Sequence, residues 1–327
     1  MKSHILIKLR TRISKQIPDW RQFILEKQQV ITELHPEVDT LLSSYHLSIW
    51  VTHEYKPALE EWSYSELATG LDRVYRIILQ EERPIPPIVI EKLSYLPLVE
   101  EVRMGEVVES SLPSIQLSLQ KPLTDLRSRK SIYLPEAHEL TEGDPRIIVA
   151  ILDTGVFPDH LEYQDSLLPG MDFVNIIDGE RKFIGDYLGY DEDSDDDVGH
   201  GTHVAGIISA KGYNLPKGVV PQCKILPVRV LGTMLQGNKR VGAGLIDNIN
   251  TGIKWAIDHG ADVINMSLGI QHQGGGLPHK EMVDYAKHKG VTMVAASGNS
   301  GKEQLYYPGE LTFQREKQTQ LFIISTS

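Results

Sequence analysis

The sequence has little cysteine, no long apolar run and no excess of positive charge. Its single cysteine, Cys223, excludes an intrachain disulfide and a zinc cage built from cysteines. No apolar run approaches the roughly 18 residues that a membrane-spanning helix needs, so we expect no membrane partner. Lys and Arg number 33 against 44 Asp and Glu, and the net charge of −11 argues against nucleic-acid binding.

The N-terminal residues also lack the apolar core of a signal peptide, because Lys8 and Arg10 interrupt the apolar run there. We therefore expect a cytoplasmic protein, with export as the alternative. Hydrophobic residues make up 41% of the 327 residues, so the chain can bury a core, and its length suggests about two domains.

The first 110 residues mix strand-like and helical patterns, which predicts a small α+β domain over residues 1–110. Ser63 and Glu66 have the spacing of a helix capping box, and the helical spacing of Leu67, Leu71 and Ile78 predicts that this helix continues through residue 78. A stretch of Ser, Gln, Pro and Leu that ends in a basic patch predicts a linker over residues 111–131. The second domain is expected over residues 132–327.

The second domain contains nearly continuous apolar strands separated by helical stripes, which is typical of a parallel sheet covered on both faces. The sequence therefore predicts an α/β fold with a doubly wound parallel sheet, beside the smaller N-terminal α+β domain. Functional residues are expected at the carboxyl ends of the strands. The predicted strands are residues 146–152, 224–230, 263–266, 292–296 and 321–324, and the predicted helices are 245–257 and 282–289.

The first motif with chemistry is Asp153-Thr154-Gly155, directly after the first of these strands. A carboxylate at the end of a buried strand needs a hydrogen-bond partner. By itself Asp153 could be a simple turn or cap residue. An aspartic protease would need a second Asp-Thr-Gly, and the sequence has none.

The second motif runs from Gly199 to Gly206 and contains His200 and His203 at the start of an expected helix. A structural histidine or a metal ligand are the alternatives to a catalytic role. The two histidines lack the four-residue offset of the zinc protease helix, and no third ligand at a suitable spacing is evident.

The third motif surrounds Asn299, which follows the 292–296 strand within Ser297-Gly298-Asn299-Ser300-Gly301. An asparagine among glycines is commonly a turn residue. Its side-chain amide could alternatively donate a hydrogen bond to a developing oxyanion.

In this order, the three motifs resemble those of the subtilisin-like serine proteases, the subtilase family, over residues 132–327. The resemblance implies a serine endopeptidase that acts on peptide or protein substrates through an Asp-His-Ser triad. Asp153 would orient the imidazole, His200 would be the general base, His203 a structural histidine, and Asn299 the oxyanion donor.

The same resemblance assigns two backbone segments to substrate binding. Ser267, Leu268 and Gly269 would wall the specificity pocket on one side, and Gly242, Ala243 and Gly244 would flank the substrate on the other. An extended peptide would bind between them by strand addition.

The family's nucleophile lies in a Gly-Thr-Ser-type motif, and this sequence contains no Gly-Thr-Ser. Ser325 and Ser327 directly follow a predicted strand that carries no nucleophile in the family. We therefore expect a peptidase sequence truncated before its nucleophile and inactive as it stands. The alternative is a non-catalytic peptide-binding or regulatory pseudoprotease.

Residues 90–102 resemble the end of a subtilase propeptide, which implies that the N-terminal domain acts as an intramolecular inhibitor or folding chaperone. The alternative is an unrelated α+β domain. No cofactor is required for the chemistry. The acidic run at residues 191–197 is either a solvated loop or a calcium site, and no metal ligands can be assigned.

Overall fold

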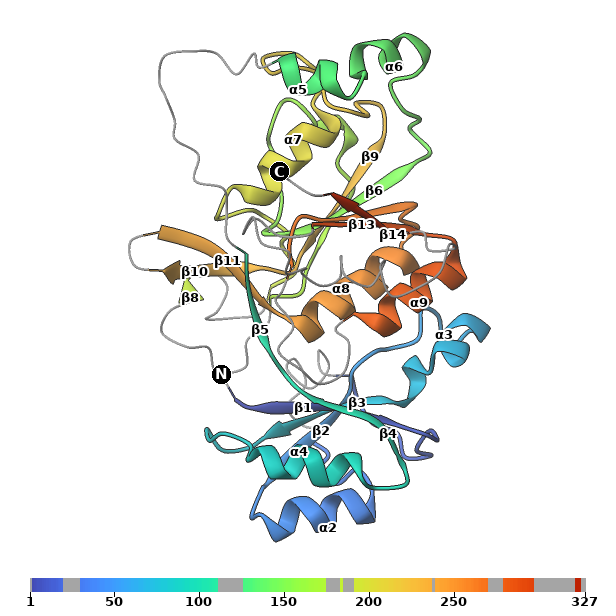
Figure 1. Ribbon diagram of the computed structural model, residues 1–327, viewed down its shortest axis with the longest axis vertical. Helices are drawn as coiled ribbons and strands as arrows, with labels where there is room; N and C mark the ends of the chain where they lie inside the picture. Colours follow the sequence, from blue (N-terminus) through green and yellow to red (C-terminus); the bar gives the residue numbers. More distant parts are fainter. Residues whose placement is uncertain are drawn as a thin grey trace.

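The computed structural model describes residues 2–19, 30–110, 126–174, 183–184, 191–236, 239–269, 279–296 and 321–324 (Figure 1). Within these ranges the strands form three sheets, one in the N-terminal unit, one in the C-terminal unit and one that joins them. None of the described helices is long and apolar enough to cross a membrane.

The N-terminal unit is a four-stranded antiparallel sheet of order β2-β3-β1-β4. Its strands are β1 (His4–Leu9), β2 (Ile49–His53), β3 (Val74–Leu79) and β4 (Val99–Met104). Helices α2 (Pro36–Ser44) and α4 (Pro87–Ser94) cover one face (Figure 1). Because side chains alternate along a strand, Ile5 and Ile7 pack into the core beneath these helices, whereas Leu6 faces the C-terminal unit.

The prediction that the helix after Ser63 continues through residue 78 is wrong beyond Thr69. Helix α3 (Tyr64–Thr69) has the expected Ser63–Glu66 capping box, but Gly70 ends it with a left-handed φ of 72°. A short 3-10 turn, η1 (Leu71–Arg73), leads directly into strand β3. The run from Val74 to Leu79 is rich in strand formers and pairs with both β1 and β2, so sheet pairing prevails over the helical spacing.

The C-terminal unit contains a parallel sheet of order β14-β13-β12-β6-β9-β7. Its strands are β6 (Ile148–Asp153), β7 (Met171–Asp172), β9 (Lys224–Arg229), β12 (Val263–Met266), β13 (Thr292–Ala296) and β14 (Leu321–Ile324). Helix α7 (His200–Ser209) lies on one face, and helices α8 (Ile246–Asp258) and α9 (Lys280–Lys289) lie on the other (Figure 1). The predicted doubly wound α/β fold with a smaller N-terminal α+β unit is confirmed.

Alternation along β6 explains why both faces are covered. Val149 and Ile151 belong to the core beneath α7, while Ala150 and Leu152 belong to the core beneath α8 and α9. The remaining short helices are α5 (Leu126–Ser131), α6 (Leu134–Leu140) and η2 (Gln164–Ser166). Helix α5 falls in the region expected to be an irregular linker.

A third sheet joins the two units, with strand order β5-β11-β10-β8. Its strands are β5 (Val107–Ser110), β8 (Phe183–Ile184), β10 (Gly232–Gln236) and β11 (Lys239–Leu245). Strand β5 continues from the N-terminal unit and pairs antiparallel with β11 of the C-terminal unit. We call this pairing of residues 107–110 with 242–245 the tail contact.

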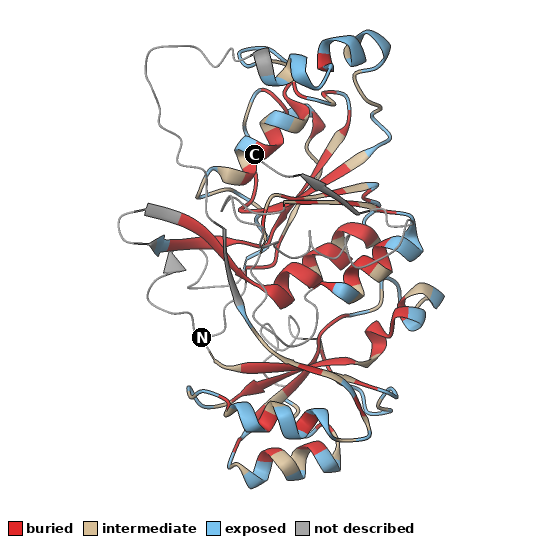
Figure 2. Ribbon diagram, viewed as in Figure 1, coloured by how far each residue is buried: buried red, intermediate tan, exposed pale blue. Residues whose placement is uncertain are grey.

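The open face of the N-terminal sheet packs on helices α8 and α9 (Figure 1). Helix α8 is buried along most of its length because it lies between two sheets (Figure 2). The interface carries buried ions: Arg103 donates to Asp247 at 3.0 Å and to Glu281 at 3.2 Å, and His4 bonds Asp247 at 2.6 Å. We call this interface of β1, β3 and β4 with α8 and α9 the body contact.

Candidate functional site

The carboxyl end of β6 brings Asp153 onto the first residue of helix α7. Asp153 is fully buried, and its Oδ1 lies 2.6 Å from Nδ1 of His200. The same oxygen accepts the Thr154 backbone N–H at 2.7 Å. The predicted proximity of Asp153 and His200 is therefore confirmed. Because a carboxylate can only accept, Nδ1 carries the proton and Nε2 of the neutral ring is left as the basic atom.

The charge state of His200 follows from this pairing. Burial by itself would lower the pKa of His200, but the hydrogen bond and negative charge of Asp153, with a contribution from Asp196, raise that pKa above its usual value. The raised pKa means that the imidazolium form is stabilised once the ring has taken up a proton. This is the property that a general base next to a carboxylate needs.

The segment 242–244 lies in β11 and is paired in register with β5. Gly242 is opposite Ser110, Ala243 is opposite Glu109, and Gly244 is opposite Val108. The two glycines are required by close packing behind the strand. A Cβ on Gly244 would lie 2.2 Å from the Val230 carbonyl oxygen, and one on Gly242 would lie 2.7 Å from a Thr154 methyl carbon. This segment of β11 therefore lies directly against the residue that follows Asp153.

The segment 267–269 follows β12, the strand next to β6 in the sheet. Leu268 is buried in the core, and Ser267 Oγ accepts a hydrogen bond from the Asn265 side chain at 3.0 Å. Parallel neighbours end at the same edge, so the segment shares the edge of the sheet that carries Asp153. Asn299, the predicted oxyanion donor, lies outside the described residues, as do Ser325 and Ser327.

His203 lies one turn from the site, and its side chain is exposed on α7. Over the described ranges, no group of three or more His, Cys, Asp or Glu is arranged to hold a metal ion. In the acidic run at 191–197, both carboxylate oxygens of Asp196 already accept hydrogen bonds from protein donors. Asp197 accepts a hydrogen bond from Arg229 at 3.2 Å. These two carboxylates do not fit a calcium site, and calcium elsewhere in the chain stays a prediction.

Asp196 is the site residue that the sequence analysis missed. Its carboxylate accepts hydrogen bonds from Thr154 at 2.8 Å and from the Thr202 backbone at 2.8 Å, so it links the two ends of the Asp153–His200 pair. An acidic residue shortly before an apolar helix is a helix-capping signal. That signal was masked by the surrounding acidic residues, which are typical of a solvated loop.

Comparison with known proteins identifies the family of the C-terminal unit. Residues 144–324 match the subtilase family, Peptidase S8. The chain belongs to the subtilase family. The match begins just before β6, ends with β14 and contains both Asp153 and His200, so the motifs and the geometry fall in the same region of this subtilase.

Several known subtilases are similar over this same region. Thermitase from Thermoactinomyces vulgaris is 35% identical over 181 residues, which are 55% of this chain and 56% of thermitase. The major intracellular serine protease of Bacillus subtilis (strain 168) is 36% identical over 185 residues, which are 55% of this chain and 52% of that protease. The chain thus spans about half the length of these relatives. Among solved structures, the prenylagaramide maturation protease PagA matches with a TM-score of 0.40 and 27% identity, covering 54% of this chain and 55% of that one.

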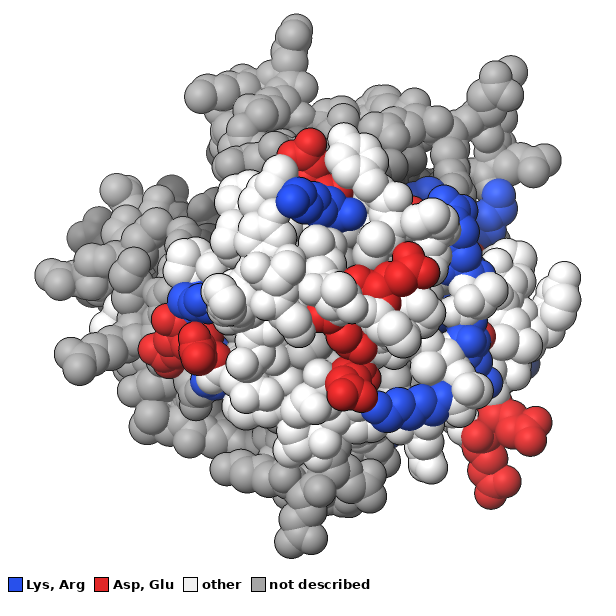
Figure 3. Space-filling model, turned by 90° about the horizontal axis from the view of Figure 1, so that it is seen from below, with Lys and Arg blue, Asp and Glu red and all other residues white. Residues whose placement is uncertain are grey.

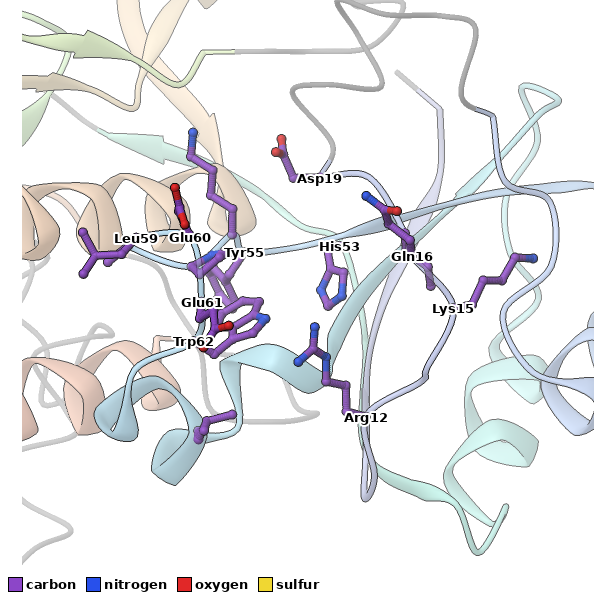
Figure 4. A pocket seen from close by; sticks show the side chains of 15 residues that line it. Arg12, Lys15, Gln16, Asp19, His53, Tyr55, Leu59, Glu60, Glu61 and Trp62 are labelled. Carbon is purple, nitrogen blue, oxygen red and sulfur yellow. The ribbon is translucent and has the colours of Figure 1, made fainter.

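A separate cavity of about 950 Å³ lies in the N-terminal unit of this subtilase (Figure 4). His53 and Arg12 extend into the same part of it (Figure 4). Burial, and then the charge of Arg12, lower the pKa of His53 to about 4, so His53 is neutral there. Basic residues such as Lys15 and acidic residues such as Glu61 both line the cavity. This mixed lining favours neither an anionic nor a cationic ligand. On the face seen from below, acidic and basic side chains of the described residues are likewise interspersed (Figure 3).

Proposed function

We propose that this chain carries the Asp-His part of a serine endopeptidase active site. The observation that carries the proposal is the buried Asp153 carboxylate 2.6 Å from His200 Nδ1 at the carboxyl edge of the parallel sheet. In this reaction His200 Nε2 takes the proton of a serine hydroxyl as the oxygen attacks the peptide carbonyl, and then returns it to the leaving amine. Asp153 holds the ring in the required tautomer throughout.

Asn299 is proposed to stabilise the tetrahedral oxyanion through its side-chain amide, on the strength of the sequence resemblance. An oxyanion donor of this kind typically contributes a factor of about 10² to 10³ in kcat. The attacking serine would come from a Gly-Thr-Ser-type motif, which is not among these 327 residues.

Peptide substrates are proposed to bind as an extended strand between segments 242–244 and 267–269. The proposal is supported by β5, because an extended segment of this chain already pairs with 242–245 in an antiparallel register. Backbone pairing supplies affinity without a sequence requirement, and the pockets beside the strand supply preference.

The N-terminal unit is proposed to act as an intramolecular inhibitor, and in folding as a chaperone for the C-terminal unit. Two contacts support this role. The tail contact occupies the strand edge to which a substrate would add, and the body contact covers α8 and α9. A chain held in both places keeps the edge blocked until the unit is released. A cytoplasmic location stays a prediction.

The second candidate function is a non-catalytic, peptide-binding pseudoprotease. Two observations support it: the edge of β11 already holds an extended segment, and these 327 residues contain no Gly-Thr-Ser motif. The two candidates share the peptide site and differ only in whether a serine is activated.

The test is to label the 327-residue chain, and any longer product of its reading frame that carries a Gly-Thr-Ser motif, with a fluorophosphonate. We expect no labelling of the 327-residue chain, and labelling and casein hydrolysis by the longer product. Both should be lost in His200→Ala and retained in His203→Ala, the matched control on the same helix. Activity that survives His200→Ala would contradict the peptidase proposal, and stoichiometric labelling of Ser325 or Ser327 would contradict the assignment of the missing nucleophile.

A further inference from the structure

Asp196 makes five hydrogen bonds with one carboxylate. Its Oδ1 accepts from the backbone N–H groups of Val198 at 3.0 Å and Gly199 at 2.7 Å, and from the Thr154 hydroxyl at 2.8 Å. Its Oδ2 accepts from the Thr202 backbone N–H at 2.8 Å and the Thr202 hydroxyl at 2.7 Å. These donors come from the end of β6, from the loop and from the first turn of α7. A single side chain therefore joins three segments.

The two threonine hydroxyls extend this connection in a fixed direction. Each hydroxyl has one proton, and each gives that proton to Asp196, so its lone pairs face other donors. The Thr154 oxygen accepts from the Gly201 N–H at 3.0 Å, and the Thr202 oxygen accepts from the Phe157 N–H at 3.0 Å. Thr154 follows Asp153 directly, and Gly201 follows His200 directly. The connection thus runs from one neighbour of the Asp153–His200 pair to the other.

The N-cap residue of α7 supplies no side-chain cap of its own. This residue is Gly199, which adopts a left-handed φ of 96° and has no side chain with which to cap the helix. Asp196 accepts the Thr202 N–H in place of an N-cap side chain. Its negative charge also interacts favourably with the positive end of the helix dipole.

The start of α7 packs so closely against the turn after β6 that the helix cannot shift without a clash. A Cβ on Gly201 would lie 2.1 Å from the Gly155 carbonyl oxygen and 3.0 Å from Asp153 Cβ. The backbone of α7 therefore touches the turn after β6. A small shift of the helix start would change the distance between Asp153 and His200.

We propose that Asp196 is a positioning residue, which fixes the start of α7 against the end of β6 and thereby holds His200 on Asp153. This inference rests on the proposed function, because it assigns Asp196 to the same site. Misplacement of a catalytic group by about 1 Å can cost about 10²-fold in rate, so a residue that sets this geometry matters to the reaction without touching the substrate.

The experiment reads the Asp153–His200 hydrogen bond directly in the 327-residue chain, by NMR of the His200 Nδ1 proton and of its imidazole titration. In Asp196→Asn the side chain keeps its shape but loses its charge and presents an amide to the donors of Thr202. We expect the downfield Nδ1 proton signal to be lost, and this signal decides the question. The His200 pKa should also fall, but part of that fall follows directly from the lost charge of Asp196. The matched control is Asp195→Asn, which removes the same charge from the exposed neighbouring side chain and should leave both readouts unchanged.

A second pair of variants removes the dependence on how well Asp196→Asn folds. Thr154→Val deletes the bridging hydroxyl while keeping the carboxylate, and should weaken the Nδ1 proton signal. Thr154→Ser keeps the hydroxyl and should behave as the unaltered chain. If Asp196→Asn does not fold, the Thr154 pair decides the question.

The outcomes separate this inference from the proposed function. Absence of an Asp153-dependent Nδ1 proton in the unaltered chain would overturn the proposed site itself. Presence of that proton, unchanged in Asp196→Asn or Thr154→Val, would overturn only the role of Asp196. Equal changes in Asp195→Asn and Asp196→Asn would also overturn it, because the effect would then be loop charge rather than position.

Discussion

The N-terminal unit touches the C-terminal unit through two contacts of different chemistry. The body contact is made by buried side chains, in which Arg103 meets Asp247 and Glu281, and Arg76 donates to Asn248 at 3.3 Å. The tail contact is a ladder of backbone pairs between β5 and β11. One contact depends on which residues are present, and the other depends mainly on an extended backbone.

This difference matters for the proposed function. The charged side chains of the body contact make the N-terminal unit specific for this C-terminal unit. The reason is that a buried charge without its counter-ion is destabilising. A backbone ladder can be exchanged for that of another extended peptide, since each residue offers the same N–H and C=O groups. We infer that the body contact makes binding of the N-terminal unit to the C-terminal unit specific. The tail contact then blocks the edge of β11 against a substrate strand.

The largest effect is expected from breaking the body contact at Arg103. Arg103→Ala leaves Asp247 and Glu281 without their common partner, and Asp247 is fully buried. We expect the free energy of unfolding to fall by about 3–5 kcal/mol. Urea unfolding measures it, with Arg146→Ala as control, because Arg146 pairs with Asp144 on the surface. An Arg103→Ala chain as stable as the control would show that the ions of the body contact contribute little.

A further loss is expected on acidification, through His279 at the start of α9. Burial, and then the charge of Arg103, lower the pKa of His279 to about 3, and its Nδ1 lies 2.5 Å from Asn250 Oδ1. The unfolded chain therefore binds a proton at higher pH than the folded chain, and stability falls as pH drops below about 6.5. The loss attributable to His279 should reach about 3 kcal/mol near pH 4.

The measurement is the pH dependence of urea unfolding in His279→Asn, which has no titrating group. Asparagine suits this position because His279 has a φ of 63°, and asparagine tolerates the left-handed region. His200 provides the contrast, since its pKa is raised and its contribution is present at low pH and lost as pH rises through that pKa. Parallel pH curves for His279→Asn and the unaltered chain would contradict the assignment.

The features that could be predicted from the sequence are those encoded by residues close together along the chain. The continuous apolar strands and the motifs around Asp153 and His200 indicated the parallel sheet and the buried pair, because each is encoded within a few neighbouring residues. Strand β3 was mistaken for a helix because Leu67, Leu71 and Ile78 fit a helical spacing. Its identity is decided by pairing with β1 and β2, which are distant in sequence.

The ionic partners could not be predicted for the same reason. Arg103 and Asp247 are 144 residues apart, and nothing in either local sequence specifies the other. Asp196 was hidden differently, because its neighbours are also acidic and only the folded loop distinguishes the carboxylate that accepts five hydrogen bonds from those that face solvent.

A smaller effect is expected from breaking the tail contact. In an antiparallel pair, alternate residues of a strand direct their N–H groups to the partner, so one of Val108 and Glu109 donates toward β11. Proline at both positions removes that donor whichever it is, and should cost about 1–2 kcal/mol. Hydrogen exchange should show faster exchange of those amides among residues 242–245 that point toward β5, while the amides that point toward β10 and those of the body of α8 stay unchanged. Equal protection of 242–245 would mean that β5 does not pair there in solution.

The smallest effect is expected when the tail side chains change and the backbone does not. Val108→Thr with Glu109→Gln keeps both N–H groups and a β-branched residue at 108, so the ladder can still form. We expect a change in stability below about 0.5 kcal/mol and the same exchange protection of residues 242–245 as in the unaltered chain. Compared with the double proline variant, this pair separates backbone from side chain at the same two positions. If the conservative pair also loosens β11, the tail is recognised by its side chains. The contrast between the two contacts would then fail, and Val107–Ser110 would instead report the residue preference of the peptide site.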